Sequence, residues 1–217
     1  MRHNMNNIKK FLVLIPMKDP SKSKSRLNKV LFAEARRRLA LQLFKNTITT
    51  LKLCFERLPR LYDLAIVTDS NEVMDIASAH NVRVIKDYNA PLLSKAIDSA
   101  AVIAVQDGYE GVCVIPADLA DPIPSDLEKL LSYPIKVNEL VICPSIDYGT
   151  NALMVSPPNI IKFKYGKKSF FKHLHAGRIK GLITTVLPLD SIRFDVDTST
   201  DLSRLFMQNP QIKSEVL

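Results

Sequence analysis

The sequence predicts an α/β protein with a mostly parallel central sheet and helices on both of its faces. Apolar runs of strand length alternate with longer stretches of helical periodicity from residue 11 onward, which is the pattern of a parallel sheet. The hydrophobic content of 47% over 217 residues is enough to fill a sizeable core. We therefore expect a flexible tail at residues 1–10 and one domain over residues 11–217.

The amino-terminal half is predicted to contain alternating strands and helices. Residues 11–16 are apolar, as expected of a strand that is buried on both faces. Apolar side chains recur every three or four positions between residues 29 and 58, and Pro59 closes this long helix. The other predicted elements are strands at 64–68, 82–86 and 112–116, a helix capped within residues 69–71 that runs through Ala79, and a helix at 91–106.

Beyond residue 116 the predicted elements are shorter. They are helices at 125–131 and 169–177, strands at 140–143, 151–155, 183–187 and 192–196, and a closing helix at 198–207. Thr198 or Ser199 supplies the cap of that last helix. The chain has no repeat, low-complexity segment or linker, so a single domain remains the prediction.

The net charge of +8 is concentrated near the amino terminus. Between Lys18 and Lys45 there are nine basic residues and two acidic ones. Such a local field attracts an anionic partner, which is a phosphorylated small molecule, a nucleic acid or a membrane surface. Charge alone does not separate a phosphate-binding loop from solvated surface lysines.

The cysteines and the amino terminus indicate the compartment. Cys54, Cys113 and Cys143 lie far apart without C-x-x-C spacing, which argues against zinc and disulfide frameworks. Cys113 and Cys143 lie within apolar runs and are expected to be buried thiols in a reducing compartment. The apolar run at 11–16 is too short for a signal sequence or a membrane span. We therefore expect a cytoplasmic protein without a membrane partner.

The loop at residues 17–26 is a candidate phosphate site. It places Lys18, Lys24 and Arg26 between a buried strand and a helix, where α/β proteins bind polyphosphate. The first glycine of the chain is Gly108, so a P-loop and a G-x-G-x-x-G turn are excluded before it. Side chains would have to bind the phosphates instead, with Lys as a point charge and Arg as a fork.

Carboxylates follow two of the predicted strands. Asp118 stands just past the strand at 112–116, at the edge where open α/β sheets bind ligands, so it is a candidate for holding Mg²⁺. Its alternative role is a helix cap. Asp195 and Asp197 flank Val196, and strand alternation would direct both toward one site. Asp197 can equally cap the closing helix.

A second candidate anion site lies in the carboxyl-terminal half. Residues 149–151 form a polar loop that leads into a strand. Gly166 and Ser169 flank two lysines at the beginning of a helix, whose free N–H groups and dipole favour anions. His173 is four residues beyond Ser169 and could therefore face the same pocket.

A family resemblance covers nearly the whole chain between Ile15 and Leu202. It rests on the segments IPMKDPSKSKSRL, VTDS, IPADLADP, GTNALMVSPP, FKYGKKSFFKHLHA and FDVDTSTDL, which occur in this order. In combination they resemble the 2-phospho-L-lactate guanylyltransferase family of coenzyme F-420 biosynthesis, whose members include enzymes that accept phosphoenolpyruvate or 3-phospho-D-glycerate. The succession of GTNAL, G-x-x-S-F-x-x-H and DVDT is the most specific part.

The resemblance implies a GT-A-like nucleotidyltransferase fold and the transfer of GMP from GTP to the phosphate of a small phospho-acid. The implied catalytic residues are Lys18, Lys24, Arg26 and Asp118, and the implied cofactor is Mg²⁺ on Asp118 with Asp195 or Asp197. The implied nucleotide-binding residues are Pro16, Lys18, Lys24, Ser25, Arg26, Thr68, Asp69, Ser94, Pro116 and Ala117. The implied acceptor-binding residues are Thr150, Asn151, Gly166, Ser169 and His173.

Two positions depart from the family pattern. Ser94 stands where asparagine is expected and Ala120 replaces a proline, both where the guanine or ribose should bind. The resemblance therefore specifies the reaction class more firmly than the base. The implied partners are GTP and one of the three acids, and the resemblance is compatible with a homodimer and with hand-off of an unstable product to the next enzyme of the pathway.

Two other functions fit parts of the sequence. A nucleotidyltransferase that uses CTP or a sugar phosphate would need the same basic loop and carboxylates. A nucleic-acid-binding module would rest on the charge of residues 18–45, but a recognition motif is missing from the sequence. The guanylyltransferase needs no strong general base, because the acceptor phosphate is already an oxyanion and catalysis consists of neutralising and aligning two polyanions.

Overall fold

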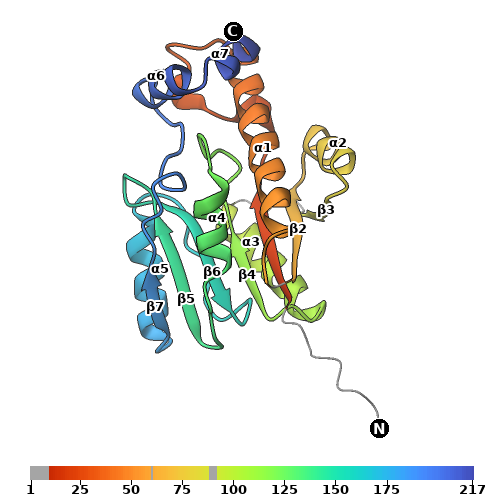
Figure 1. Ribbon diagram of the computed structural model, residues 1–217, viewed down its shortest axis with the longest axis vertical. Helices are drawn as coiled ribbons and strands as arrows, with labels where there is room; N and C mark the ends of the chain where they lie inside the picture. The colour runs from red at the N-terminus through yellow and green to blue at the C-terminus, as the bar shows by residue number, and fades with distance from the viewer. Residues whose placement is uncertain (1–9, 60, 88–91) are drawn as a thin grey trace.

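The computed structural model describes residues 10–59, 61–87 and 92–217, and it confirms the predicted α/β class (Figure 1). The strands are β1 (Lys10–Pro16), β2 (Leu61–Thr68), β3 (Arg83–Lys86), β4 (Gly111–Val114), β5 (Glu139–Pro144), β6 (Thr150–Ser156) and β7 (Ile183–Val186). They form one sheet of seven strands in the order β3-β2-β1-β4-β6-β5-β7. All pairings are parallel except those of β6, which runs antiparallel to β4 and β5. The carboxyl ends of the other strands therefore share one edge with the amino end of β6.

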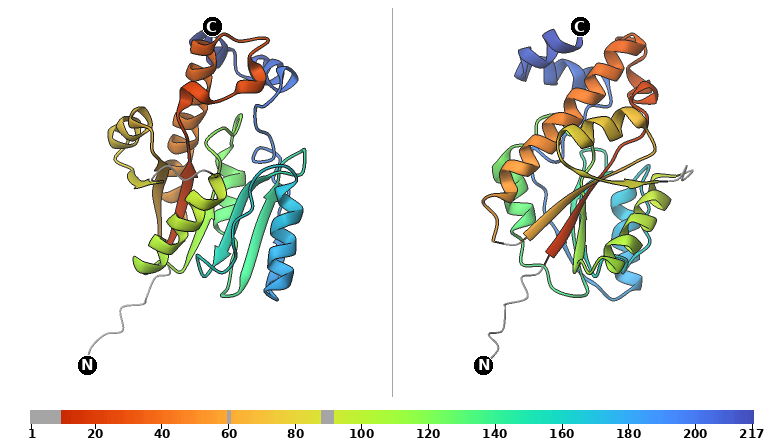
Figure 2. Two further views of the ribbon diagram at one scale, coloured as in Figure 1. Left: turned by 180° about the vertical axis from the view of Figure 1, so that it is seen from behind. Right: turned by 90° about the vertical axis from the view of Figure 1, so that its right-hand side faces the viewer.

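Helices cover both faces of the sheet, as predicted (Figures 1 and 2). They are α1 (Ala33–Phe55), α2 (Asn71–Ala79), α3 (Leu93–Gln106), α4 (Pro124–Leu131), α5 (Ser169–Ile179), α6 (Ser199–Gln208) and α7 (Pro210–Val216). α1, α2 and α4 pack on one face, and α3 and α5 pack on the other. α7 was not predicted; Pro210 occupies its first turn, where the missing N–H of proline is tolerated.

The central strand β1 shows why its sequence is apolar throughout. Val13 and Ile15 belong to the core under α1, whereas Leu12 and Leu14 belong to the core under α3, and all four are fully buried. Because both faces are covered, alternation with polar residues disappears. β1 thereby fixes the position of Pro16 and of the basic loop that follows it.

The two halves of helix α1 belong to different hydrophobic cores. Its carboxyl-terminal half places Phe44, Ile48 and Leu51 on the sheet. Its amino-terminal half, with Leu39 among others, packs against α6 and α7 in a separate core. In Figure 1 these two helices lie at the top of the molecule, beside the start of α1.

The predicted strand at residues 192–196 was wrong. Within the described residues this segment forms one isolated antiparallel bridge, between Leu119 and Asp195, and lies outside the sheet. The N–H of Ala120 also donates to the carbonyl of Phe194 at 3.0 Å. The apolar side chains that suggested a strand are buried between the sheet and α6 instead of pairing along a ladder. The segment therefore joins the loop after β4 through backbone contacts.

Several smaller predictions can be compared directly. Lys10 is the first residue of β1, and residues 1–9 of the expected tail lie outside the described residues. Cys113 and Cys143 are buried free thiols, as expected, and Cys54 is a third. None of the described helices combines the length and the apolar character that crossing a membrane requires.

Candidate active site

Two adjoining cavities lie at the carboxyl edge of the sheet. The smaller one, of about 250 Å³, is bounded by the loops after β1 and β4, and we call it the loop cavity. The larger one, of about 510 Å³, extends to the beginning of β6, and we call it the β6 cavity. Both are lined by Pro16, Leu93, Pro116, Asp118 and Asp197. These residues form a common wall, so ligands in the two cavities would meet at Asp118.

The loop after β1 is shaped by two short 3-10 turns, Pro20–Lys22 and Ser25–Leu27. Asp19 caps the first turn, accepting hydrogen bonds from the backbone N–H and hydroxyl of Ser21, which lower the pKa of this carboxyl. Lys24 precedes the second turn in the left-handed conformation, with φ of 52°. The loop therefore reverses at Lys24, whose side chain enters the loop cavity.

Four charged side chains connect this loop to the two acidic segments. Lys24 Nζ lies 2.7 Å from Asp118 Oδ2 and 3.8 Å from Asp197 Oδ1. Arg26 reaches the same carboxylate, with its Nη1 2.7 Å from Asp197 Oδ2. The Lys24 side chain is 4% exposed and that of Arg26 is 71% exposed. Lys24 is thus an interior cation of the cleft, whereas Arg26 stands at its mouth.

Asp195 is the most deeply placed carboxylate of the cleft. Burial, followed by the negative charge of Asp118, raises the pKa of Asp195 to about 6. The amide of Asn151 donates to Asp195 Oδ1 at 3.2 Å and to the carbonyl of Ile192 at 3.0 Å, which orients the carboxylate. A cation placed between Asp195 and Asp118 would stabilise both charged carboxylates.

The carboxylates fit a magnesium ion that keeps part of its water shell. In the described part of the chain, no group of three or more His, Cys, Asp or Glu side chains is arranged to hold a metal. Mg²⁺, however, is commonly held by one or two carboxylates together with water and substrate phosphates. Asp118 and Asp195 would meet that smaller requirement. Asp118 is ion-paired with Lys24, and Asp197 is paired with Arg26 and lies near Lys24, so an ion held by either carboxylate would share it with a basic side chain.

A buried hydroxyl pair forms the far wall of the β6 cavity. Thr150 and Ser169 both line it, and their oxygens are 3.0 Å apart. His173 lies behind them with no exposed surface, 3.0 Å from Thr150 Oγ1 through its Nδ1. Burial, and then the charges of Lys172 and Lys164, lower the pKa of His173 to about 4. His173 was predicted to face the pocket; it supports the pocket wall from behind.

Comparison with known proteins identifies the family. A family description, "Guanylyl transferase CofC like", matches residues 11–216. The chain belongs to this family. It is 33% identical over 204 residues to a 3-phospho-D-glycerate guanylyltransferase from Colwellia psychrerythraea, covering 94% of this chain and 95% of that protein. It is 28% identical to a phosphoenolpyruvate guanylyltransferase from Rubrobacter xylanophilus, covering 88% and 91% of the two chains.

A third relative and two solved structures complete the comparison. A 2-phospho-L-lactate guanylyltransferase from Methanocaldococcus jannaschii is 30% identical, with 91% of this chain and 83% of that protein covered. The fold resembles a nucleotidyl transferase from Methanothermobacter thermautotrophicus, with TM-score 0.65, 13% identity and coverage of 92% and 97%. It also resembles a 4-diphosphocytidyl-2C-methyl-D-erythritol synthase from Anaerococcus prevotii, with TM-score 0.61, 12% identity and coverage of 94% and 97%. The protein is therefore a guanylyltransferase of the CofC-like family with a nucleotidyltransferase fold.

The CofC-like site gathers most of the residues predicted for it. The loop cavity is lined by Pro16, Lys18, Lys24, Pro116, Ala117, Asp118 and Asp197. The β6 cavity is lined by Arg26, Thr150, Asn151, Gly166, Ser169 and Asp195, besides the shared wall. Ser25 is exposed and lines neither cavity. Residues from six separate segments of the sequence thus converge on one cleft.

Three further predicted nucleotide-binding residues line neither cavity, and two of them have hydrogen-bond partners elsewhere. Thr68 is fully buried at the end of β2 and accepts a hydrogen bond from the N–H of Ser70 at 3.1 Å. Asp69 follows it and is exposed. Ser94 Oγ accepts from the N–H of Tyr165 at 2.9 Å, so it anchors a residue that lines the β6 cavity. Their roles toward the nucleotide stay predictions.

Sequence reasoning missed two polar residues of the β6 cavity. Ser145 and Asp147 follow β5 and line the cavity. The hydroxyl of Ser145 and the N–H of Gly149 donate to Asp147 Oδ1, and they lower the pKa of Asp147. Their position after a buried strand was the available signal, because β5 ends at the same edge as β1 and β4.

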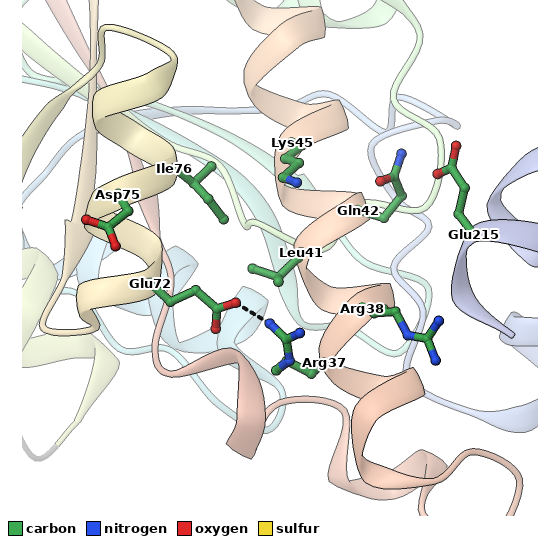
Figure 3. A pocket seen from close by; sticks show the side chains of 9 residues that line it. All are labelled: Arg37, Arg38, Leu41, Gln42, Lys45, Glu72, Asp75, Ile76 and Glu215. Carbon is green, nitrogen blue, oxygen red and sulfur yellow. Dashed lines mark hydrogen bonds and ion pairs between the residues drawn. The ribbon is translucent and has the colours of Figure 1, made fainter.

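The basic side chains of residues 18–45 lie in two separate places in the structure. The first part of this segment supplies the cleft, whereas Arg37, Arg38 and Lys45 line a third cavity of about 570 Å³ between α1, α2 and α7 (Figure 3). Glu72, Asp75 and Glu215 line the same cavity, and Arg37 is ion-paired with Glu72. Acidic side chains balance the basic ones there, and the cleft likewise sets Lys18, Lys24, Arg26 and Lys167 against Asp118, Asp147, Asp195 and Asp197.

Proposed function

We propose that this guanylyltransferase transfers GMP from GTP to the phosphate of a small phospho-acid, namely 2-phospho-L-lactate, phosphoenolpyruvate or 3-phospho-D-glycerate, in coenzyme F-420 biosynthesis. The observation that carries the proposal is the shared wall at Asp118, between a cavity lined by lysines and a cavity lined by hydroxyls. The names of the relatives, which cover all three acids, support the same reaction.

In the proposed reaction an oxygen of the acceptor phosphate attacks the α-phosphorus of GTP. The new P–O bond forms as the bond to the β-phosphate breaks, and pyrophosphate leaves with the electron pair. Lys24 and Lys18 line the cavity that would receive the triphosphate, so their charges would stabilise the leaving pyrophosphate. Arg26 lines the adjoining β6 cavity and pairs with Asp197 of the shared wall, so it would reach the same group from that side with a forked contact.

The cleft residues would also hold Mg²⁺. We propose Asp118 and Asp195 as its protein ligands, because they are the carboxylates whose charges disfavour each other. When bound, the ion would supply charge neutralisation to the phosphate oxygens of the nucleotide. Asp197 would hold Arg26 and Lys24 in place and would contribute less to the metal.

The acceptor would occupy the β6 cavity. Thr150 and Ser169 offer hydroxyls there, and Lys167 adds a positive charge to the lining. Gly166 has φ of 104°, a conformation that side chains rarely adopt, so glycine is needed for the chain to enter α5 in this way. The carboxylate of the phospho-acid would lie at this end, and its phosphate would point toward Asp118.

The decisive experiment is incubation of the protein with Mg²⁺, one acid and one nucleotide, followed by mass detection of products. Each of the three acids is tested with GTP, CTP and ATP. We expect a GMP adduct of at least one acid and release of pyrophosphate. Adducts from CTP in place of GTP would assign the protein to the rival nucleotidyltransferase type. Absence of any adduct, with salt-dependent binding to DNA or RNA, would support the nucleic-acid-binding alternative.

A further inference from the structure

The protonation state of His173 is determined by its two hydrogen-bond partners. The backbone N–H of Lys164 points at His173 Nε2 at a distance of 2.9 Å. A backbone N–H can donate and cannot accept, so Nε2 must be the unprotonated nitrogen. The ring is therefore neutral and carries its proton on Nδ1. That proton is donated to Thr150 Oγ1, 3.0 Å away.

Because His173 donates to Thr150, it determines which hydroxyl protons of Thr150 and Ser169 remain free to donate into the cavity. Thr150 Oγ1 accepts from His173, and a single hydrogen bond connects it to Ser169 Oγ at 3.0 Å. Ser169 donates this bond, so it uses the hydroxyl proton of Ser169 and leaves that of Thr150. Neither hydroxyl has another hydrogen-bond partner within the described residues. One O–H is therefore left to donate toward the cavity that both residues line.

We propose that His173 is a positioning residue of the acceptor site, which forces the Thr150–Ser169 pair to present a donor to an anionic oxygen of the phospho-acid. This inference rests on the proposed function and deepens it, because it states the chemistry that this corner recognises. Carboxylate and phosphate oxygens satisfy the free donor directly.

The surroundings of His173 hold the ring in this orientation. It packs edge-on against the rings of Tyr165 and Phe163, at centroid distances of 5.0 and 6.5 Å. Lys164 and Lys172 are the charged residues that act on it, and both disfavour the imidazolium. Burial acts in the same direction. The imidazole is therefore kept as a neutral donor, so its effect on Thr150 does not depend on pH near neutrality.

The test compares two substitutions with opposite donor capacity. His173→Asn keeps an N–H₂ near the position of Nδ1, whereas His173→Leu removes the donor at similar volume. Affinity for each phospho-acid is measured by calorimetry, and KM for GTP is measured separately. We expect His173→Leu to weaken binding of the phospho-acid about tenfold or more, because one charge-assisted hydrogen bond is lost. Its KM for GTP should stay within about twofold of the wild-type value. His173→Asn should remain within about threefold of the wild type for both.

A second measurement addresses the tautomer without using turnover. The ¹⁵N resonances of His173 in the labelled wild-type protein should report a proton on Nδ1 between pH 6 and 8. A proton on Nε2 would overturn the inference, as would equal effects of the Leu and Asn variants on acid affinity. Absence of affinity for all three acids in the wild type would overturn it too. Formation of the GMP adduct is scored independently, so failure of the proposed reaction is distinguishable from failure of this inference.

Discussion

Lys24 and Asp118 are joined by an ion pair of 2.7 Å although 94 positions separate them in the chain. The Lys24 side chain is almost completely buried, and Asp118 stands in the wall shared by the two cavities. The pair therefore sets the charge at the point where the two substrates are proposed to meet. If the charge of Asp118 is removed, Asp197, 3.8 Å from the buried Lys24 ammonium, is the acidic partner that remains.

Replacing Asp118 with Asn should abolish most turnover. The substitution keeps the size of the side chain but removes the charge proposed to bind Mg²⁺, and we expect kcat to fall by about 100-fold or more. The circular dichroism spectrum should be unchanged, because the backbone contacts of this loop do not involve the side chain. Asp121→Asn, at an exposed carboxylate three residues away, is the matched control. Near-normal GTP-dependent activity in Asp118→Asn would show that the metal assignment is wrong.

Arg26→Ala should affect nucleotide binding and spare stability. The Arg26 side chain is 71% exposed, and exposed ion pairs contribute about 0–1 kcal/mol to the free energy of unfolding. KM for GTP should nevertheless rise about tenfold, since a charge-assisted contact to the triphosphate is lost. Arg57→Ala removes a comparable exposed pair with Glu128, remote from the cleft, and should change neither quantity. An unchanged KM in Arg26→Ala would remove Arg26 from the nucleotide site.

Ser169→Ala should raise KM for the phospho-acid more than KM for GTP. Its hydroxyl lines the β6 cavity and contacts Thr150, so its loss removes one member of the donor pair. We expect an increase of about tenfold for the acid. Ser203→Ala, whose hydroxyl bonds the carbonyl of Ser199 within α6, should behave as the wild type. The opposite ranking of the two KM values would move Ser169 to the nucleotide side.

The buried neutral His173 should contribute a loss of stability in mild acid, against an opposite contribution from Asp195, whose pKa is raised to about 6. The pKa of His173 is about 4 in the folded protein, against 6.5 for an unperturbed imidazole, so the unfolded chain binds the extra proton first. Stability from this group is complete above pH 6.5 and is lost as the pH falls toward 4, by about 3 kcal/mol. Urea unfolding at pH 7, 5.5 and 4 measures the effect.

The control for this pH dependence is a pair of substitutions. His173→Asn should remove the loss due to the ring and leave the opposite contribution of Asp195, because the titrating ring is gone while a donor to Thr150 remains. His175→Asn, at an exposed position two residues away, should leave the wild-type dependence in place. Equal pH dependence in the wild type and in His173→Asn would contradict the assignment of the buried neutral ring.

The sequence predicted the elements whose burial is decided locally. β1 could be recognised because both of its faces are covered, which leaves a continuous apolar run. The segment at 192–196 alternates apolar and polar residues, as a strand covered on one face does, but among the described residues it pairs only through one bridge, and strand pairing is a property of the fold. Alternating apolar residues fit an extended chain packed under a helix as well as they fit a sheet.

The sequence predicted which charged residues line the candidate site, but it did not predict how deeply the residues around it are buried. Asp118 and the loop lysines follow strands, and the strand-end rule places them correctly. The depth of His173 depends on the rings of Phe163 and Tyr165, which another segment brings against it. The division of the basic segment depends on which face of α1 each residue occupies relative to α2 and α7. Neither relationship is contained in the spacing of the residues themselves.

The backbone bridge between Leu119 and Asp195 holds the shape of the cleft without using the side chains that are proposed to do its chemistry. Two loops that carry the acidic side chains are held together by main-chain atoms, with the contact between Ala120 and Phe194 extending the join. Side chains at positions 118 and 195 can therefore be exchanged while the walls keep their shape. An inactive variant made by changing these side chains should therefore still bind both substrates, and the complex could then be crystallised before it reacts.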